Sequence, residues 1–230
     1  MGVLAFGDSI TNGGGELQFG VALQSWALWV ARALGVPFMG FATDGARAAD
    51  VVTEQIPAQR RQSADPGARY DLGCVYIGVN DVRATDWDAV AFERDLATAL
   101  DFLAQRCDRT LTLTIPLDLG RPPARYVREG NAAIERSAAA PGTLVADLRG
   151  FRGRRVVMAD HVHPTAFGQI AIAERALASL AADGRPPKVM PSSLIRYDTT
   201  RWKRLRGDFT YAYRHAKVSA RDAALRVRAR

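Results

Sequence analysis

Three polar residues in two distant segments have the types and spacing of a nucleophile with its base. Ser9 lies in Gly-Asp-Ser, directly after the apolar run Gly2–Phe6, and Asp160 and His163 stand three positions apart in Asp-His-Val-His. That spacing is about one helical turn, so the carboxylate of Asp160 can reach the Nδ1–H of His163 and leave Nε2 free to take a proton. These residues predict the base and the orienting acid for a nucleophilic serine.

Each of these segments also has an ordinary structural interpretation. A serine after a strand is commonly a turn residue, and Asp160 can be a helix cap beside a surface histidine. His161 competes with His163, but adjacent side chains such as those of Asp160 and His161 point apart. We expect Asp8 to hold the turn through hydrogen bonds to the backbone rather than to act as the acid.

Two further segments supply candidates for binding an oxygen that gains negative charge. Gly45 lies in Asp-Gly-Ala, a turn that can present backbone N–H groups and lets a reacting group approach closely. Asn80 follows an apolar run in Gly-Val-Asn-Asp, and its side-chain amide can donate to such an oxygen. As plain structure, Asp-Gly is a common turn and Asn-Asp caps a helix, which is the role we expect for Asp81.

The elements that must position these residues alternate between apolar runs and helical patterns. The expected strands are Val3–Phe6, Phe38–Phe41, Leu72–Ile77, Thr110–Ile115 and Thr143–Asp147. The expected helices are Ala22–Leu34, Asp88–Gln105, Arg125–Ala139 and Thr165–Ala182. This alternation predicts an α/β fold, a three-layer α/β/α sandwich with a central, mostly parallel five-stranded sheet. Right-handed crossovers then bring several strand ends, and the residues that follow them, to one edge.

Taken in order, the segments resemble the four sequence blocks of the SGNH, or GDSL-type, hydrolases. The matching stretches are Gly7-Asp8-Ser9, Gly45, Gly78-Val79-Asn80-Asp81 and Asp160-His161-Val162-His163, within about residues 2–182. The resemblance implies the flavodoxin-like fold of that family and a catalytic triad of Ser9, Asp160 and His163. It also implies an oxyanion hole formed by the N–H groups of Ser9 and Gly45 and the amide of Asn80. The implied reaction is cleavage of a carboxylic ester through an acyl-enzyme, without a metal or cofactor.

Specificity is less well defined by the sequence. Leu117 and Leu119 follow the fourth apolar run and are candidates for the rim of an acyl pocket, although a plain loop is the commoner case. The glycine-rich segment 12–24 is a second candidate for the substrate rim. A small ester with a short acyl chain is the default substrate, because nothing resembles a large lid. The sequence does not predict the oligomeric state.

The charge is divided unevenly and places a boundary near residue 184. Residues 185–230 hold 13 Lys or Arg against 3 acidic residues, a net of +10, whereas residues 1–184 have a net of −3. We therefore expect a catalytic domain over 1–184 and a basic, aromatic-containing extension over 185–230. The extension either contacts an anionic surface, nucleic acid or membrane, or packs aromatic residues such as Trp202 and Tyr211 on the domain. In the alternative hypothesis the domain is a non-catalytic or narrowly specific binding scaffold that attaches through this extension.

Composition argues against several other classes of protein. No apolar run approaches the roughly 20 residues that span a bilayer, and no signal peptide is recognised, so we expect a cytoplasmic protein. Cys74 and Cys107 are far apart, and we expect two free thiols. No group of residues has metal-ligand spacing, so neither metal nor cofactor is expected.

Overall fold

The computed structural model describes residues 2–228 apart from 64, 66 and 198, and side chains as far as residue 221. Five strands form one sheet in the order β2-β1-β3-β4-β5, and each neighbouring pair is parallel. The strands are β1 (Val3–Gly7), β2 (Phe38–Gly40), β3 (Leu72–Tyr76), β4 (Thr110–Leu113) and β5 (Thr143–Ala146). All five predicted strands are confirmed within a residue or two of their expected ends.

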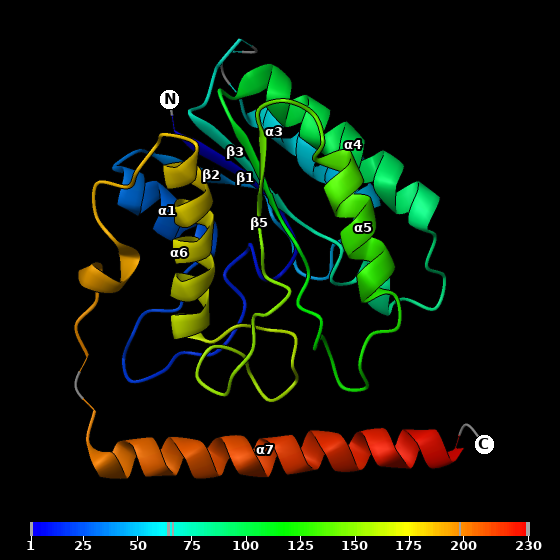
Figure 1. Cartoon of the computed structure of the whole chain (residues 1–230), viewed down its shortest axis with the longest axis vertical. Coiled ribbons are helices and arrows are strands. Elements are labelled where there is room, and N and C mark those ends of the chain that lie inside the picture. The colour runs from blue at the N-terminus through cyan, green and yellow to red at the C-terminus, as the bar shows by residue number, and fades with distance from the viewer. Residues whose placement is uncertain (1, 64, 66, 198, 229–230) are drawn as a thin grey trace.

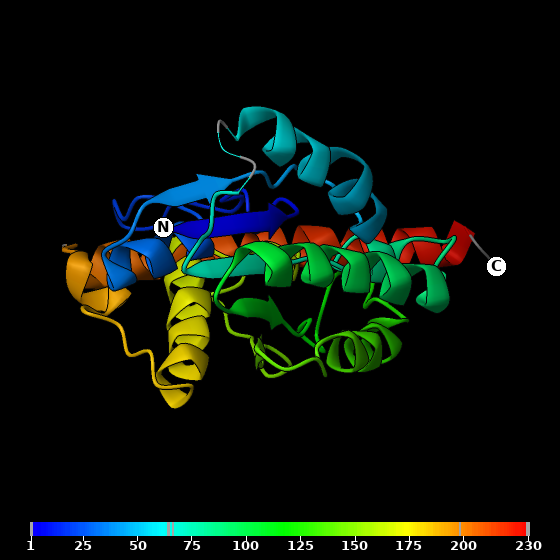
Figure 2. The same ribbon diagram turned by 90° about the horizontal axis from the view of Figure 1, so that it is seen from above.

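Helices cover both faces of the sheet (Figures 1 and 2). On one face α1 (Trp26–Leu34) packs against α6 (Ala166–Ala182), and on the other α4 (Ala89–Arg106) packs against α5 (Val127–Ser137). The second face also carries α2 (Ala48–Asp50), the π-helical segment Val51–Gln55 and α3 (Ile56–Gln62). The predicted three-layer α/β/α arrangement is confirmed.

The first residues of the long helices follow from side-chain caps. Asp88 accepts hydrogen bonds from two backbone N–H groups of the first turn of α4, and Thr165 accepts one from Gly168 at the start of α6. Ser25 caps α1, so this helix begins later than the predicted Ala22. These caps explain why the three helices begin where they do.

Residues 188–194 contact α1 and α6 before the last helix begins. The Lys188 N–H donates to the Ala33 carbonyl oxygen in α1, and the 3-10 turn Pro191–Leu194 contacts α1 and α6. α7 (Arg201–Arg228) then runs along the bottom of the molecule in Figure 1. It lies beside the loops that follow the carboxyl ends of the strands. The helices expected from the sequence do not include this one.

Two features of the described residues bear on the class of protein. No helix among them is long and apolar enough to cross a membrane. Cys74 and Cys107 are buried free cysteines, as expected, and burial raises the pKa of the Cys107 thiol to about 12. Both thiols therefore stay protonated and unreactive at neutral pH.

Candidate active site

The turn that ends β1 presents Ser9 at the edge of the sheet. Gly7 has a φ of +151°, and a side chain there would collide with the carbonyl oxygen of Tyr76 on the neighbouring strand. The buried side chain of Gln55 accepts a hydrogen bond from the Gly7 N–H at 3.0 Å and donates to the Gly7 carbonyl oxygen at 2.8 Å. Gln55 thus holds the backbone two residues before Ser9 from both sides.

Asp8 and Gln169 hold the other side of this turn. Asp8 is fully buried and accepts a hydrogen bond from the Ile10 N–H at 2.9 Å, which is the turn-holding role that the sequence predicts. Burial raises the pKa of Asp8 to about 7, against the effects of that hydrogen bond and of His163. Gln169 of α6 donates to the carbonyl oxygens of Ile10 and Gly14 at 2.9 and 3.0 Å.

Ser9, His163 and Asp160 form one chain of hydrogen bonds. The Ser9 Oγ lies 3.1 Å from the His163 Nε2, and the His163 Nδ1 lies 2.8 Å from the Asp160 Oδ2. The other carboxylate oxygen of Asp160 accepts the backbone N–H groups of Val162 at 2.9 Å and of His163 at 3.1 Å. The three-residue spacing therefore does bring the carboxylate and the imidazole into contact, within reach of Ser9.

The pKa values of His163 and Asp160 are shifted in the directions that suit a base working near neutral pH. The hydrogen bond that His163 donates to Asp160 raises the pKa of His163 above its usual value, although burial acts the other way. Burial raises the pKa of Asp160, but the hydrogen bonds from His163 and from the Val162 N–H outweigh it and leave that pKa below its usual range. Asp160 therefore stays ionised and favours the proton on the Nδ1 of His163, which leaves Nε2 as the acceptor for Ser9.

His161, the competing histidine, makes a different pair. Its Nδ1 lies 3.0 Å from the Asp118 Oδ2, and its ring faces His215 of α7 with ring centroids 5.6 Å apart. Burial lowers the pKa of His161. The structure therefore separates the two histidines, one toward Ser9 and the other toward α7.

Two of the three residues predicted to bind an oxyanion line one cleft of about 480 Å³. Gly45 and Asn80 both line it, and Asn12, three residues after Ser9, donates to Asp44 at 2.9 Å. Gly45 has a φ of +79°, a left-handed conformation that favours glycine, and open space lies where a side chain would project. Among the described residues, the backbone N–H groups of Ser9 and Gly45 have no acceptor.

Asn80 is held in place by the loop that carries Gly45. Its Nδ2 donates to the Ala46 carbonyl oxygen at 3.0 Å, which leaves the second amide hydrogen without an acceptor among the described residues. Asp81 accepts the Ala48 N–H at 3.1 Å and so caps α2. The expected capping role of Asp81 is therefore present, but on a helix earlier in the chain rather than on the one that follows.

The two leucines predicted to form the rim lie elsewhere. Leu119 is fully buried in the hydrophobic core, and Leu117 is exposed. Neither lines the cleft beside Gly45, which residues 121–126 do line. The glycine-rich segment instead contributes residues 16–19 to a separate pocket against α7.

Sequence reasoning missed Gln55 and Gln169, which hold the turn of Ser9. Each is a buried glutamine within a helix, and its partners are 48 and 159 residues away in sequence. No local motif marks such residues. A polar side chain on the inward face of a helical pattern is the one signal that indicates them.

Among the described residues, no group of three or more His, Cys, Asp or Glu is arranged to hold a metal ion.

Solved structures of other proteins share this fold. Axe2, an acetylxylan esterase from Geobacillus stearothermophilus, superposes with a TM-score of 0.59 at 20% identity, covering 77% of this chain and 93% of its own. TesA superposes with a TM-score of 0.61 at 21% identity, covering 78% and 98%. LAE5, an α/β hydrolase from the metagenome of Lake Arreo, Spain, superposes with a TM-score of 0.59 at 22% identity, covering 78% of this chain and 94% of its own. A search of curated proteins finds no match.

The parallel five-stranded sheet with helices on both faces is an α/β fold of the SGNH-hydrolase type. The sequence matches the model of the GDSL-like lipase/acylhydrolase family over residues 5–170, which includes every residue of the predicted triad and oxyanion hole. The chain therefore belongs to the GDSL-like lipase/acylhydrolase, or SGNH, family.

Proposed function

We propose that the protein hydrolyses carboxylic esters at Ser9 through an acyl-enzyme. The observation that carries this proposal is the hydrogen-bonded chain from Ser9 Oγ through His163 to Asp160, with distances of 3.1 and 2.8 Å. His163 removes the proton of Ser9 as its oxygen attacks the carbonyl carbon, and then gives that proton to the leaving alcohol. Water next attacks the acyl-enzyme with His163 again as the base, which releases the acid and restores Ser9.

The negative charge of the tetrahedral intermediate needs donors that are fixed before the reaction. The N–H groups of Ser9 and Gly45 and the second amide hydrogen of Asn80 are the donors that we assign, because they lack acceptors among the described residues. Removing one such donor from an enzyme typically lowers the rate by about 10²–10³. Asn80 is the one of the three that a side-chain substitution can remove.

The cleft beside Gly45 and Asn80 favours a substrate that carries negative charge. Four arginines line it: Arg47, Arg83, Arg121 and Arg125. Arg47 and Arg121 form ion pairs with Asp86 and Asp118, whereas Arg83 has no ion pair among the described residues. We keep the short acyl chain that the sequence analysis expected, because the cleft contains few large apolar side chains.

Hydrolysis of p-nitrophenyl esters from acetate to long-chain acyl groups tests the proposal. We expect the wild type to prefer short chains and the Ser9→Ala variant to lose both the initial burst and the steady rate. Circular dichroism of the variant shows whether the fold is kept. A full burst from folded Ser9→Ala protein would refute the role of Ser9.

A further inference from the structure

α7 is an amphipathic helix whose apolar face points away from the domain. Trp202, Phe209 and Tyr213 are 74, 68 and 70% exposed, and Leu205 is 44% exposed. Their spacing of three and four residues places them along one side of the helix, which we name the aromatic stripe. Water-exposed aromatic side chains aligned over three turns leave an apolar surface that is characteristic of an interaction site.

The opposite face of α7 holds the helix to the domain through polar contacts. Asp208 forms an ion pair with Arg154 at 3.2 Å, and Arg214 forms one with Glu16 at 2.6 Å. Tyr211 is half-buried on this side. The structure therefore divides the aromatic residues that the sequence analysis grouped together, since Tyr211 packs on the domain and Trp202 does not.

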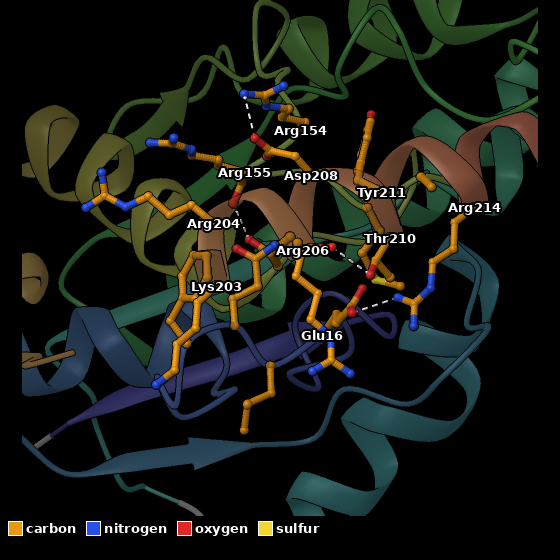
Figure 3. Close-up of a pocket in the computed structure, with 17 residues that line it drawn as sticks. Glu16, Arg154, Arg155, Lys203, Arg204, Arg206, Asp208, Thr210, Tyr211 and Arg214 are labelled. Atoms are coloured by element: carbon orange, nitrogen blue, oxygen red, sulfur yellow. Dashed lines mark hydrogen bonds and ion pairs between the residues drawn. The ribbon is translucent and has the colours of Figure 1, made fainter. Parts of the chain in front are cut away.

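The chemistry around the aromatic stripe is strongly basic. Residues 201–221 hold seven Lys or Arg and one acidic residue, and that residue, Asp208, is already paired with Arg154. Lys203, Arg206 and Arg214 lie on one flank of α7 and line a pocket of about 300 Å³ between the helix and the domain (Figure 3). Arg155 lines the same pocket from the domain side. Since Arg154 and Arg214 are paired with Asp208 and Glu16, the cations of the rim that remain for anionic groups include Lys203, Arg206 and Arg155.

These observations favour one occupant of the stripe over two others. A second copy of this chain would bring two basic helices together, which like-charge repulsion opposes. Duplex nucleic acid satisfies the charge, but its bases must unstack before aromatic side chains can stack on them. An anionic membrane surface satisfies both features at once, because an interfacial helix buries an apolar stripe among the acyl chains while flanking Lys and Arg contact the headgroups.

We propose that α7 docks the protein on an anionic lipid surface, with Trp202, Phe209 and Tyr213 inserted and Lys203, Arg206 and Lys217 against the headgroups. The helix is about 42 Å long and lies across the catalytic edge of the sheet (Figure 1). Its His215 contacts His161, which lies in the segment of Asp160 and His163. Docking would therefore hold this edge close to the lipid surface, a consequence for substrate supply that rests on the proposed hydrolysis.

Vesicle flotation tests the docking with the full chain and without any reaction. The Ser9→Ala protein is mixed with vesicles of phosphatidylcholine and phosphatidylglycerol in equal parts, or of phosphatidylcholine alone. We expect binding to the mixed vesicles only. Trp202→Ser/Phe209→Ser/Tyr213→Ser should weaken binding at least about tenfold, because the stripe supplies the buried apolar area. Each of Lys203→Gln, Arg206→Gln and Lys217→Gln should weaken it about fivefold.

A matched control replaces three apolar residues that are exposed elsewhere. Val90→Ser/Met190→Ser/Leu194→Ser removes residues that are 79, 42 and 47% exposed and lie outside α7, and it should leave binding unchanged. Hydrolysis of a soluble ester should be the same in the stripe variant as in the wild type, which shows that the domain is intact. Failure of the proposed hydrolysis would remove that readout but not the flotation result, so the two failures are distinguishable.

Two outcomes would overturn the proposal. The first is equal binding to the mixed vesicles by the stripe variant and the wild type. The second is no binding of the wild type to the mixed vesicles. In that case a concentration-dependent dimer that the stripe variant lacks would assign the stripe to a second copy. Tight binding of single-stranded or duplex DNA, measured by fluorescence anisotropy, would assign α7 to nucleic acid.

Discussion

Replacing Asp160 by asparagine should move the proton of neutral His163 from Nδ1 to Nε2 while keeping the shape of the site. One carboxylate oxygen of Asp160 accepts two backbone N–H groups, from Val162 and His163. An asparagine can keep those two bonds only with its carbonyl oxygen in that place. Its NH₂ group then faces the Nδ1 of His163, where the carboxylate now accepts at 2.8 Å. The Nδ1 must become an acceptor, so Nε2 carries the proton and cannot take one from Ser9.

The size of the effect follows from two contributions. Loss of the carboxylate charge about 4 Å from the imidazolium costs between about 1 kcal/mol in water and about 4 kcal/mol at a protein surface. The Asp160 side chain is 36% exposed, so solvent screens part of this interaction. The inverted tautomer adds to the loss, and together they predict a kcat that is about 10²–10⁴-fold lower.

The assay is the pre-steady-state burst with p-nitrophenyl acetate, which reports acylation directly. Asp118→Asn is the matched control, because Asp118 pairs with the neighbouring His161 at 3.0 Å in the same way. We expect that variant to acylate within about threefold of the wild type. Acylation of Asp160→Asn within about threefold of the wild type, with the fold intact, would refute the assignment of Asp160.

Three further predictions follow from the same site. Because Asp160 raises the pKa of His163, kcat/KM should fall as pH drops through that raised pKa, where the imidazole becomes protonated and stops acting as a base; a flat profile would contradict this. Asn80→Ala should lower kcat about 10²–10³-fold with little change in KM, and a loss confined to KM would remove Asn80 from the oxyanion hole. Arg83→Gln should lower kcat/KM about fivefold for a monosuccinate ester and not for a neutral ester of equal length, since an exposed charge pair is worth about 1 kcal/mol; equal losses on both esters would argue against an anionic substrate.

The parallel sheet and the long helices could be predicted because their local patterns agree with their final environment. β1 and β3 are buried along their whole length and are apolar in sequence. Asp88 and Thr165 cap α4 and α6 through contacts within three residues, so their roles are visible locally. The same holds for Asp160 and His163, whose contact spans three residues.

The parts that the sequence analysis missed depend on distant contacts or on an unusual exposure pattern. Helical residues 48–62 lack an apolar stripe, because the buried Gln55 and Gln59 occupy part of the inward face and Pro57 interrupts the pattern. α7 does have helical spacing, but its stripe faces solvent instead of the core. Leu119 was misplaced at the rim because a residue after a strand can turn inward as readily as outward.

The most direct test of the account is to find where the acyl group forms. The protein is quenched with acid during the burst with p-nitrophenyl acetate, digested, and mapped by mass spectrometry. We expect the added mass of one acetyl group on the peptide that contains Ser9, and no such peptide from Ser9→Ala protein. Acetyl on a different residue, or steady hydrolysis with no acetylated peptide and an unchanged rate in Ser9→Ala, would contradict it.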